Sequence, residues 1–387
     1  MNNRTWAEIN TDALIHNFKE IRRITDKNAM IMAIVKADAY GHGVLEITKT
    51  LIGCGANYLG VACADEGMQL RRAGVTLPIL ILGASQDSEL EDIINYSLMP
   101  SVFTYDFALK LSKTAEKLQK SAKIHIKIDT GMSRIGFVSD IDDDALSDEI
   151  IKISSLPNIE IEGIFSHFST SDEADTEYTN LQFERFLTVC NILEEKNLHI
   201  PIRHIANSAA IMEHPHTHLE MVRAGVILYG LYPSDEVDRT KINLIPVMTV
   251  KSSITMIKEL PQNRGVSYGK TYITNHPMRI ATIPIGYADG YTRLLSDKAR
   301  MIVNNIPVPV IGRICMDQCM IDVTNVNTIN TGDEVIVFGA DTVTAEILAN
   351  LIGTINYEIV CMISKRVPRI YLKDGKAVKT LNYLNKL

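Results

Sequence analysis

Eight short apolar runs of β type recur along the first part of the chain, and most are separated by a stretch long enough to hold a helix. The runs are residues 30–35, 58–62, 78–82, 99–103, 124–128, 161–165, 202–206 and 222–228. In the stretches 64–73 and 181–195 an apolar residue returns every three or four positions, which is the helical period. Strands that are buried on both faces read as continuous apolar runs. The pattern therefore predicts a (β/α)8 barrel over residues 11–240, with an open doubly wound sheet as the alternative.

From about residue 241 the pattern changes to Val, Ile and Thr runs broken by Pro, Gly and Asn, such as LIPVMTVKSSI, RIATIPIG and DEVIVFG. This indicates a mostly β domain over residues 241–387. Residues 1–10 carry no helical pattern, and we expect them to join that domain. A chain of 387 residues is too long for one ordinary core, so two domains are expected on size as well.

Composition excludes several classes of function. A net charge of -7 argues against a nucleic-acid partner, because neutralising phosphates requires clustered Lys and Arg. No apolar run approaches the ~18 residues of a membrane span, and the first ten residues do not resemble an export signal, so we expect a cytoplasmic protein. The six cysteines form no C-x-x-C pair, which argues against a disulfide framework or a zinc ribbon. A small-molecule partner fits best.

Polar residues collect where the expected strands end. In a (β/α)8 barrel the chemistry lies at the carboxyl ends of the strands. The residues at these exits are Lys36 after the first strand, Lys127, Asp129 and Arg134 at the fifth, Ser166 and His167 at the sixth, Asn207 and Ser208 at the seventh, and Arg223, Gly225 and Tyr229 at the eighth. At least three cations are thus expected at one end of the barrel.

Lys36 is the candidate nucleophile. A lysine buried at a strand end favours its neutral form, and a neutral amine attacks an aldehyde to give a Schiff base. The alternative is a surface lysine whose stem covers apolar neighbours. Ser208 and the backbone at Gly225 fit a phosphate site, which the last strands of such barrels often build, although ordinary loop polar groups would look the same.

The segments AIVKADAYGHG, IKIDTGMSRIG, SHF, HIANSAA and VRAGVILYG resemble those of the alanine racemase family of fold-type-III pyridoxal-phosphate enzymes, and the resemblance covers nearly the whole chain. It implies pyridoxal 5'-phosphate as the cofactor, with Lys36 as the lysine that binds it covalently. The other implied cofactor-binding residues are Tyr40, His167, Asn207, Ser208, Arg223, Gly225, Val226 and Tyr357. Lys127 would be carbamylated and would hold Arg134 toward the substrate carboxylate.

The β region carries the rest of the resemblance in GVSYGKTY, IPIGYADGY, IGRICMDQCMID and NYEIVCMISK. Tyr268 would be the second catalytic base, Tyr287 and Met316 would contact substrate beside Arg134, and Asp317 and His167 would support them. The family resemblance implies a homodimer in which the β domain of one subunit completes the barrel mouth of the other. The implied reaction interconverts L-alanine and D-alanine with two bases, Lys36 and Tyr268, and supplies D-alanine for peptidoglycan.

Three rival functions share features with this sequence. A decarboxylase of the same fold would need a glycine-rich phosphate loop that is missing here, and a non-catalytic pyridoxal-phosphate protein would consist of the barrel alone. A racemase acting on serine or on several amino acids remains an alternative, because one methylene changes discrimination by only about 1–3 kcal/mol.

Three other motifs are set aside. GVSYGKT has three residues, not four, between Gly265 and Gly269, so it is not a P-loop, and the GHG of residues 41–43 lacks the third glycine of a dinucleotide fingerprint. His214, His216 and His218 lack the spacing of a helical metal pair and are expected in a solvated loop, so no metal is expected.

Overall fold

The structure is a computed structural model that describes residues 4–340 and 342–385. The chain divides into two compact units, which are treated separately below. The barrel unit contains residues 14–39 and 44–245. The β unit contains, among the described residues, 4–13, 40–43, 246–340 and 342–385. The segment 40–43, although it follows the first barrel strand closely in sequence, therefore clusters with the β unit.

The barrel unit is built on parallel strands in the order β10, β2, β3, β4, β5, β6, β8, β9. Their bounds are β2 (Met30–Ile34), β3 (Tyr58–Val61), β4 (Ile79–Ile81), β5 (Met99–Val102), β6 (Ala122–Asp129), β8 (Ile159–Phe165), β9 (Ile202–His204) and β10 (Met221–Ala224). At the seam between β9 and β10 the amide of Arg223 donates to the carbonyl of Ala206 at 3.0 Å, so the barrel is nearly closed. The barrel prediction is confirmed, and all eight predicted strands are present.

The eighth strand is shorter than predicted. It ends at Ala224, and the apolar run continues as the 3-10 helix η3 (Val226–Tyr229), which is fully buried. A buried helical turn and a buried strand have the same apolar composition, so the sequence pattern did not separate them.

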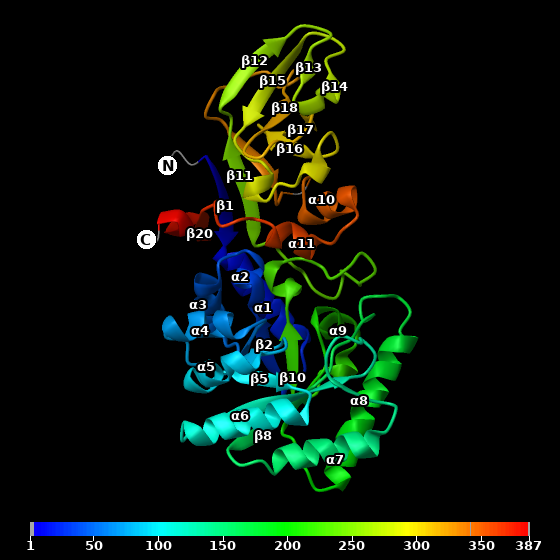
Figure 1. The fold of residues 1–387 in the computed structure, drawn as a ribbon. Helices are drawn as coiled ribbons and strands as arrows, with labels where there is room; N and C mark the ends of the chain where they lie inside the picture. The colour runs from blue at the N-terminus through cyan, green and yellow to red at the C-terminus, as the bar shows by residue number, and fades with distance from the viewer. Residues whose placement is uncertain (1–3, 341, 386–387) are drawn as a thin grey trace. The chain divides into compact units, whose positions relative to one another are not determined.

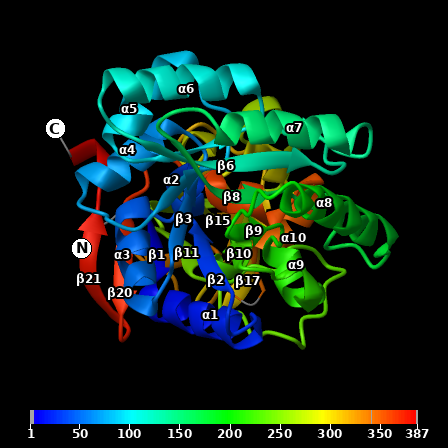
Figure 2. The ribbon, with the colours of Figure 1, turned by 90° about the horizontal axis from the view of Figure 1, so that it is seen from below.

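Helices surround these strands, as Figure 2 shows in the view from below. They are α1 (Thr11–Ile24), α3 (Val44–Cys54), α4 (Ala64–Arg72), α5 (Leu90–Asn95), α6 (Tyr105–Lys117), α7 (Asp143–Ser154), α8 (Glu177–Glu195) and α9 (Ser208–Glu213). Short polar side chains fix several of their starts: Thr104, Asp142 and Asn207 accept from the first-turn amides of α6, α7 and α9. The two predicted helical stretches coincide with α4 and α8.

The β unit has a long, mostly antiparallel sheet in the order β12, β15, β18, β17, β16, β19, β11, β1, β20, β21 (Figure 1). The bounds are β1 (Thr5–Asn10), β11 (Met248–Ser253), β12 (Met256–Leu260), β15 (Met278–Ile283), β16 (Arg300–Val303), β17 (Ile306–Ile311), β18 (Cys319–Asp322), β19 (Glu334–Phe338), β20 (Arg369–Lys373) and β21 (Lys376–Leu381). A small pair, β13 (Gly265–Val266) and β14 (Tyr272–Ile273), and the helices α10 (Ala345–Ile352) and α11 (Asn356–Cys361) complete it.

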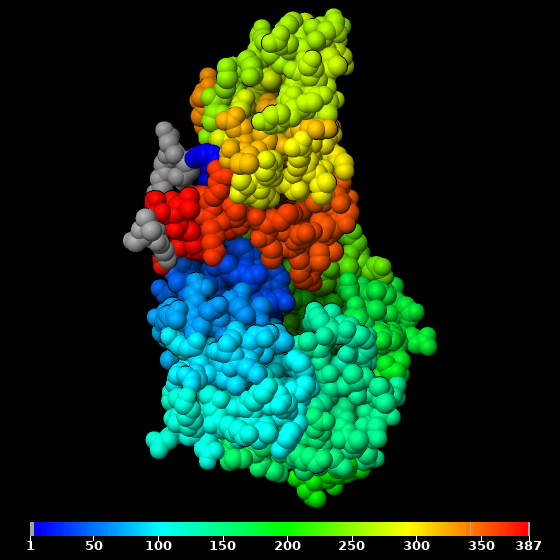
Figure 3. Space-filling view, viewed as in Figure 1, coloured from blue at the N-terminus to red at the C-terminus, as the bar shows by residue number. Residues whose placement is uncertain are grey.

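Strand β1 lies inside this sheet, antiparallel to β11 and parallel to β20. Its side chains alternate between buried and partly buried, which is the pattern of a strand with one face on the core. The space-filling view shows segments of this unit from around residue 300 (yellow) and from near the end of the chain (red) side by side (Figure 3).

The histidine cluster differs from the sequence interpretation. His214 and His218 are buried, and each places a ring nitrogen 3.2 Å from a backbone carbonyl, of Ser171 and Ile211 respectively. The prediction of a solvated loop was therefore wrong for these two. Within residues 4–340 and 342–385, no group of three His, Cys, Asp or Glu is arranged to hold a metal ion, and no helix is long and apolar enough to cross a bilayer.

Candidate active site

Lys36 lies directly after β2 and opens a left-handed turn. The segment α2 (Lys36–Tyr40) has φ angles of 53°, 54°, 54° and 52° at Ala37, Asp38, Ala39 and Tyr40. A left-handed helical conformation costs about 1–2 kcal/mol for each residue that carries a Cβ. Four such residues in a row persist only where neighbours hold them, and strain of this kind is concentrated at functional sites.

The neighbours that hold this turn are two carboxylates. Glu66 accepts from the amide of Ala37 through one oxygen and from that of Ala62 through the other, both at 2.7 Å. Asp38 accepts from the amide of Val44 at 2.8 Å. The backbone at Lys36 is therefore fixed by hydrogen bonds from both sides of the turn.

Tyr40 and Tyr357, two predicted phosphate contacts, come together in the β unit. Their ring centroids are 6.2 Å apart, and burial raises the pKa of Tyr40, helped by Tyr357 and Cys361. The backbone after Tyr40 is tightly enclosed. A Cβ on Gly41, where φ is +79°, would lie 2.4 Å from the carbonyl oxygen of Val360.

Arg223 lies on β10, and its guanidinium is buried in the barrel. It donates to Nδ1 of His167 and Nδ1 of His204, each at 2.9 Å, and to the carbonyls of Ser166, His204 and Ile205 at 2.8–3.1 Å. Its Nε donates to none of the residues that the structure describes. Burial, and to a smaller extent the charge of Arg134, lowers the pKa of Arg223 to about 9, so the group is still charged at neutral pH. One strong donor of this cation thus stays available to a ligand.

His167 shows that the predicted cations converge. Burial lowers its pKa well below the usual range, and the charges of Arg223, Arg134, Lys127 and Lys36 lower it further. These four residues come from the ends of β2, β6 and β10, so their joint effect on one ring places them at one end of the barrel. His167 is therefore neutral, and the cations around it suit an anionic ligand.

Lys127 is buried on β6, and its Nζ donates to the carbonyl of Ile128 at 2.6 Å. Burial and the charge of Arg223 lower its pKa to about 7, and Arg134 adds to this, while Asp129 acts in the opposite direction. A lysine with this pKa is about half neutral at pH 7. Arg134 itself is exposed.

The ends of β9 and β10 are joined by a hydrogen bond. The amide of Gly225 donates to Oγ of Ser208 at 3.0 Å, and Val226 follows at the start of η3. Asn207 caps α9 and also accepts from the hydroxyl of Ser171 at 2.9 Å. Asn207, Ser208, Gly225 and Val226 therefore form one polar corner of the barrel unit. Tyr229, also at this strand end, is instead buried and donates to the carbonyl of Ile34.

In the β unit, three predicted site residues are exposed: Tyr268 at 65%, Met316 at 52% and Tyr287 at 41%. The amides of Tyr287 and Ala288 donate to the carbonyls of Cys315 and Met316 at 3.1 and 3.0 Å, so Tyr287 and Met316 lie in adjoining loops. Tyr268 lines a surface hollow of about 570 Å³ together with Ser267 and Cys315.

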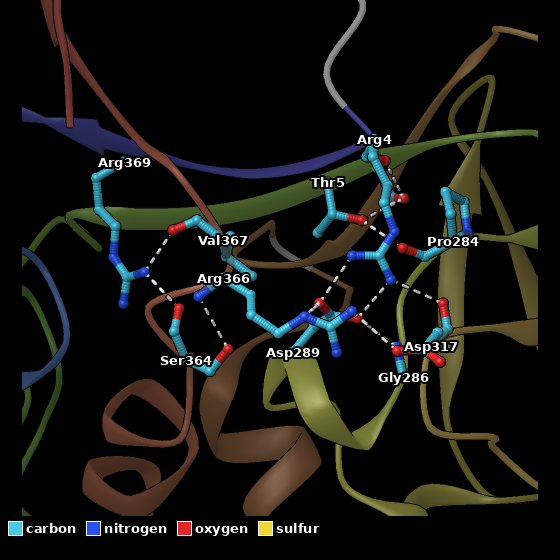
Figure 4. Close-up of polar contacts among 11 residues, drawn as sticks. Arg4, Thr5, Pro284, Gly286, Asp289, Asp317, Ser364, Arg366, Val367 and Arg369 are labelled. Atoms are coloured by element: carbon cyan, nitrogen blue, oxygen red, sulfur yellow. Dashed lines mark hydrogen bonds and ion pairs between the residues drawn. The ribbon is translucent and has the colours of Figure 1, made fainter. Parts of the chain in front are cut away.

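An ion cluster that sequence reasoning missed holds these loops (Figure 4). Arg4 donates to both oxygens of the fully buried Asp289 at 2.9 Å and to the carbonyl of Asp317 at 2.9 Å. Arg366 lies 3.6 Å from the Asp289 carboxylate and 2.9 Å from that of Asp317. These residues are far apart in sequence, and only the tertiary structure brings them together. The position of Asp289 within the largely apolar segment IPIGYADGY was the one sequence signal that its carboxylate is buried and paired.

Two histidines inside the barrel were also missed. His125 precedes Lys127 by two positions on β6, and strand side chains alternate, so both lie on the same face. That spacing was a usable signal. His204 ends β9, and both rings are fully buried.

Comparison with known proteins shows which family this chain is similar to. Residues 9–233 match the family described as alanine racemase, N-terminal domain, and residues 247–371 match the alanine racemase C-terminal domain. The alanine racemase of Clostridium tetani is 50% identical, and alanine racemase 1 of Clostridium acetobutylicum is 51% identical, each over 98% of both chains.

Solved structures give the same result. Alanine racemase of Clostridium difficile 630 superposes with a TM-score of 0.96 at 44% identity, over 99% of this chain and 100% of that one. The Bacillus anthracis alanine racemase with bound L-Ala-P has a TM-score of 0.93 at 35% identity, over the whole of both chains.

Proposed function

Because this chain belongs to the alanine racemase family, we propose that it is an isomerase that interconverts L-alanine and D-alanine with pyridoxal 5'-phosphate bound to Lys36. The observation that carries this proposal is the convergence of Lys36, Lys127, Arg134 and Arg223 around the neutral ring of His167. A cationic barrel end suits a phosphorylated cofactor and a substrate carboxylate, both of which are anions.

The donor set fits this cofactor. Lys36 supplies the amine for the aldehyde, and the unused Nε of Arg223 supplies a donor for the ring nitrogen. The hydroxyl of Ser208 and the amide of Val226 offer donors for the phosphate, and the amide of Gly225 would join them by exchanging its bond to Ser208. Tyr40 and Tyr357 are further candidates, and Asn207 supports the corner. When bound, the cofactor withdraws electrons from the substrate α-carbon and so makes its proton easier to remove.

Arg134 and Lys127 would hold the substrate. Arg134 binds the carboxylate through charge-assisted hydrogen bonds. Because the pKa of Lys127 is lowered to about 7, its neutral amine would add to carbon dioxide at neutral pH and release a proton to water. The resulting carbamate anion would give Arg134 an anionic partner.

Racemisation requires a base on each side of the α-carbon, and we assign these roles to Lys36 and to Tyr268 of the partner subunit. Arg223 donates to Nδ1 of His167, which leaves the ring proton of the neutral His167 on Nε2. That Nε2–H would donate to the phenol oxygen of Tyr268 and stabilise its anion, which makes the phenol a stronger acid.

A homodimer accounts for the exposed residues of the β unit. Tyr268, Met316 and Tyr287 are all substantially exposed in their own chain, and Leu294 nearby in the sequence is 62% exposed. Large exposed apolar groups of this kind mark interaction surfaces. We propose that a second copy of the chain covers them and that Tyr287, Met316 and Asp317 complete its site.

The names of the relatives favour alanine over serine or a broader substrate range, and the match of both family domains disfavours a non-catalytic cofactor-binding protein. A cytoplasmic role in supplying D-alanine for peptidoglycan is the corresponding cellular proposal.

The test is to incubate the purified protein with one enantiomer of alanine, serine or lysine and to separate the products on a chiral column. We expect alanine to racemise fastest. Tyr268→Phe should remove solvent deuterium exchange for one alanine enantiomer more than for the other. Equal losses for both would contradict separate roles for the two bases.

A further inference from the structure

A chain of polar side chains, buried at its centre and partly buried at both ends, crosses the barrel interior and extends beyond Arg223 and His167. Nε2 of His204 lies 3.0 Å from Nδ1 of His125, and Nε2 of His125 lies 3.8 Å from a carboxylate oxygen of Glu162. At the other end, Nδ1 of His204 lies 2.9 Å from a guanidinium nitrogen of Arg223. The order is therefore Glu162, His125, His204, Arg223 and His167, with strands β8, β6, β9 and β10 each contributing.

Arg223 determines where the protons lie, because a guanidinium nitrogen only donates. Nδ1 of His204 must accept from it, so the proton of the neutral His204 ring is on Nε2. That Nε2–H then donates to Nδ1 of His125, and the proton of His125 is on its Nε2, facing Glu162. Burial lowers the pKa of both histidines, which keeps the rings neutral.

The last contact explains two otherwise unsatisfied atoms. Nε2 of His125 and one oxygen of Glu162 are buried without a hydrogen-bond partner, and they are the two atoms that face each other at 3.8 Å. A shift of a few tenths of an ångström toward each other would satisfy both. The pKa of Glu162 is lowered to about 2, chiefly by interaction with His125, so the carboxylate is charged.

Arg223 needs a distant counter-charge. Among the residues that the structure describes, no carboxylate lies within 4.0 Å of its guanidinium, and all its protein partners are neutral. A buried charge without compensation is costly. The two neutral rings connect the Arg223 cation to the Glu162 anion through polarised hydrogen bonds.

The packing around His125 and His204 fits this chain of side chains. A Cβ on Gly163 would lie 2.4 Å from Nδ1 of His125, so only glycine leaves room for that ring. The ring of Phe165 stacks on His204 with centroids 4.9 Å apart and planes 1° from parallel. Gly163 and Phe165 thus hold the rings of His125 and His204, respectively, in close packing.

We propose that Glu162 and His125 are positioning residues, which act through His204 to hold the Arg223 guanidinium where it donates to His167. The kinetic consequence rests on the proposed function, whereas the proton positions do not. Glu162 and His125 would thus support the ligand-facing end of the barrel from its interior.

Proton positions are measured by nuclear magnetic resonance of the full-length protein labelled with ¹⁵N in its histidine rings. We expect His125, His204 and His167 to be neutral with the proton on Nε2 from pH 6 to pH 8, assigned by loss of signals in His125→Phe and His204→Phe. A proton on Nδ1 of His204, or a charged His125, would overturn the proposal whether or not the protein racemises alanine.

Glu162→Gln tests the charge, and Glu160→Gln is its control, since both glutamates on β8 pair with Lys123 but only Glu162 faces His125. We expect Glu162→Gln to lower kcat for alanine about tenfold with KM little changed and to shift the His167 ring signals. Glu160→Gln should change neither. Gly163→Ala, which displaces the His125 ring, should reproduce the Glu162→Gln effects. Unchanged kcat and His167 signals in Glu162→Gln would refute the role.

Discussion

The buried amine of Lys127 should make folding stability depend on pH in a way that one substitution removes. Its pKa is lowered from the ordinary 10.5 to about 7. Below pH 7 both the folded and unfolded states carry the proton, and the folded state bears the full penalty of the buried charge. Between pH 7 and pH 10.5 only the unfolded state keeps the proton, so stability rises with pH. Above pH 10.5 the penalty is gone.

The magnitude follows from the two pKa values. Each pKa unit is worth about 1.4 kcal/mol, so the full penalty is about 5 kcal/mol, of which about 4 kcal/mol is relieved between pH 6 and pH 10. Lys127→Met has a similar length and no charge. The free energy of unfolding of the wild type, measured relative to Lys127→Met, should therefore rise by about 4 kcal/mol over this range.

The assay is urea unfolding followed by circular dichroism in buffers free of carbon dioxide. Comparing the two proteins at each pH cancels the other titrating groups. Added bicarbonate should reduce the difference at pH 7, because carbamylation replaces the buried cation with an anion paired to Arg134. Parallel curves for the two proteins would refute a lowered Lys127 pKa.

Three further substitutions, one of them a control, test the supports of the site. Ala37→Gly should stabilise the protein by about 0.5–1 kcal/mol, because relief of a left-handed φ outweighs the added freedom of the unfolded chain. Ala145→Gly, at an exposed position of the right-handed helix α7, should destabilise it by a similar amount, and thermal unfolding measures both. Asp289→Asn should cost about 1.5–3 kcal/mol, because Arg4 and Arg366 lose hydrogen bonds to a charged group but remain partly solvated. It should also raise KM for alanine through the loosened Tyr287 loop. A KM equal to that of the wild type would show that the ion cluster does not position Tyr287.

The barrel could be predicted from the sequence because parallel strands that are buried on both faces produce apolar runs at regular intervals. The end of the eighth strand could not be predicted in the same way, since residues 226–229 form a buried 3-10 helix that is as apolar as the strand before it. Strand exits meet at one barrel end, so the sequence predicted that Lys36, Lys127, His167 and Arg223 would lie near one another, and the structure brings them together. The roles of these residues are the proposal made above.

Other features depend on tertiary contacts that leave no local pattern. The pairing of Arg4 with Asp289 joins residues 285 positions apart, and the left-handed turn after Lys36 contains ordinary alanines where glycine would be the usual signal. His214 and His218 were misread because a polar sequence with Pro is typical of surface loops, whereas here backbone carbonyls satisfy the buried rings.

Borohydride reduction followed by peptide mass spectrometry tests directly the proposal that Lys36 binds the cofactor covalently. After incubation with pyridoxal 5'-phosphate, the reduced cofactor should be found on Lys36, and Lys36→Ala should show neither the label nor the visible absorbance. A label on another lysine, or a reducible chromophore retained in Lys36→Ala, would contradict the account.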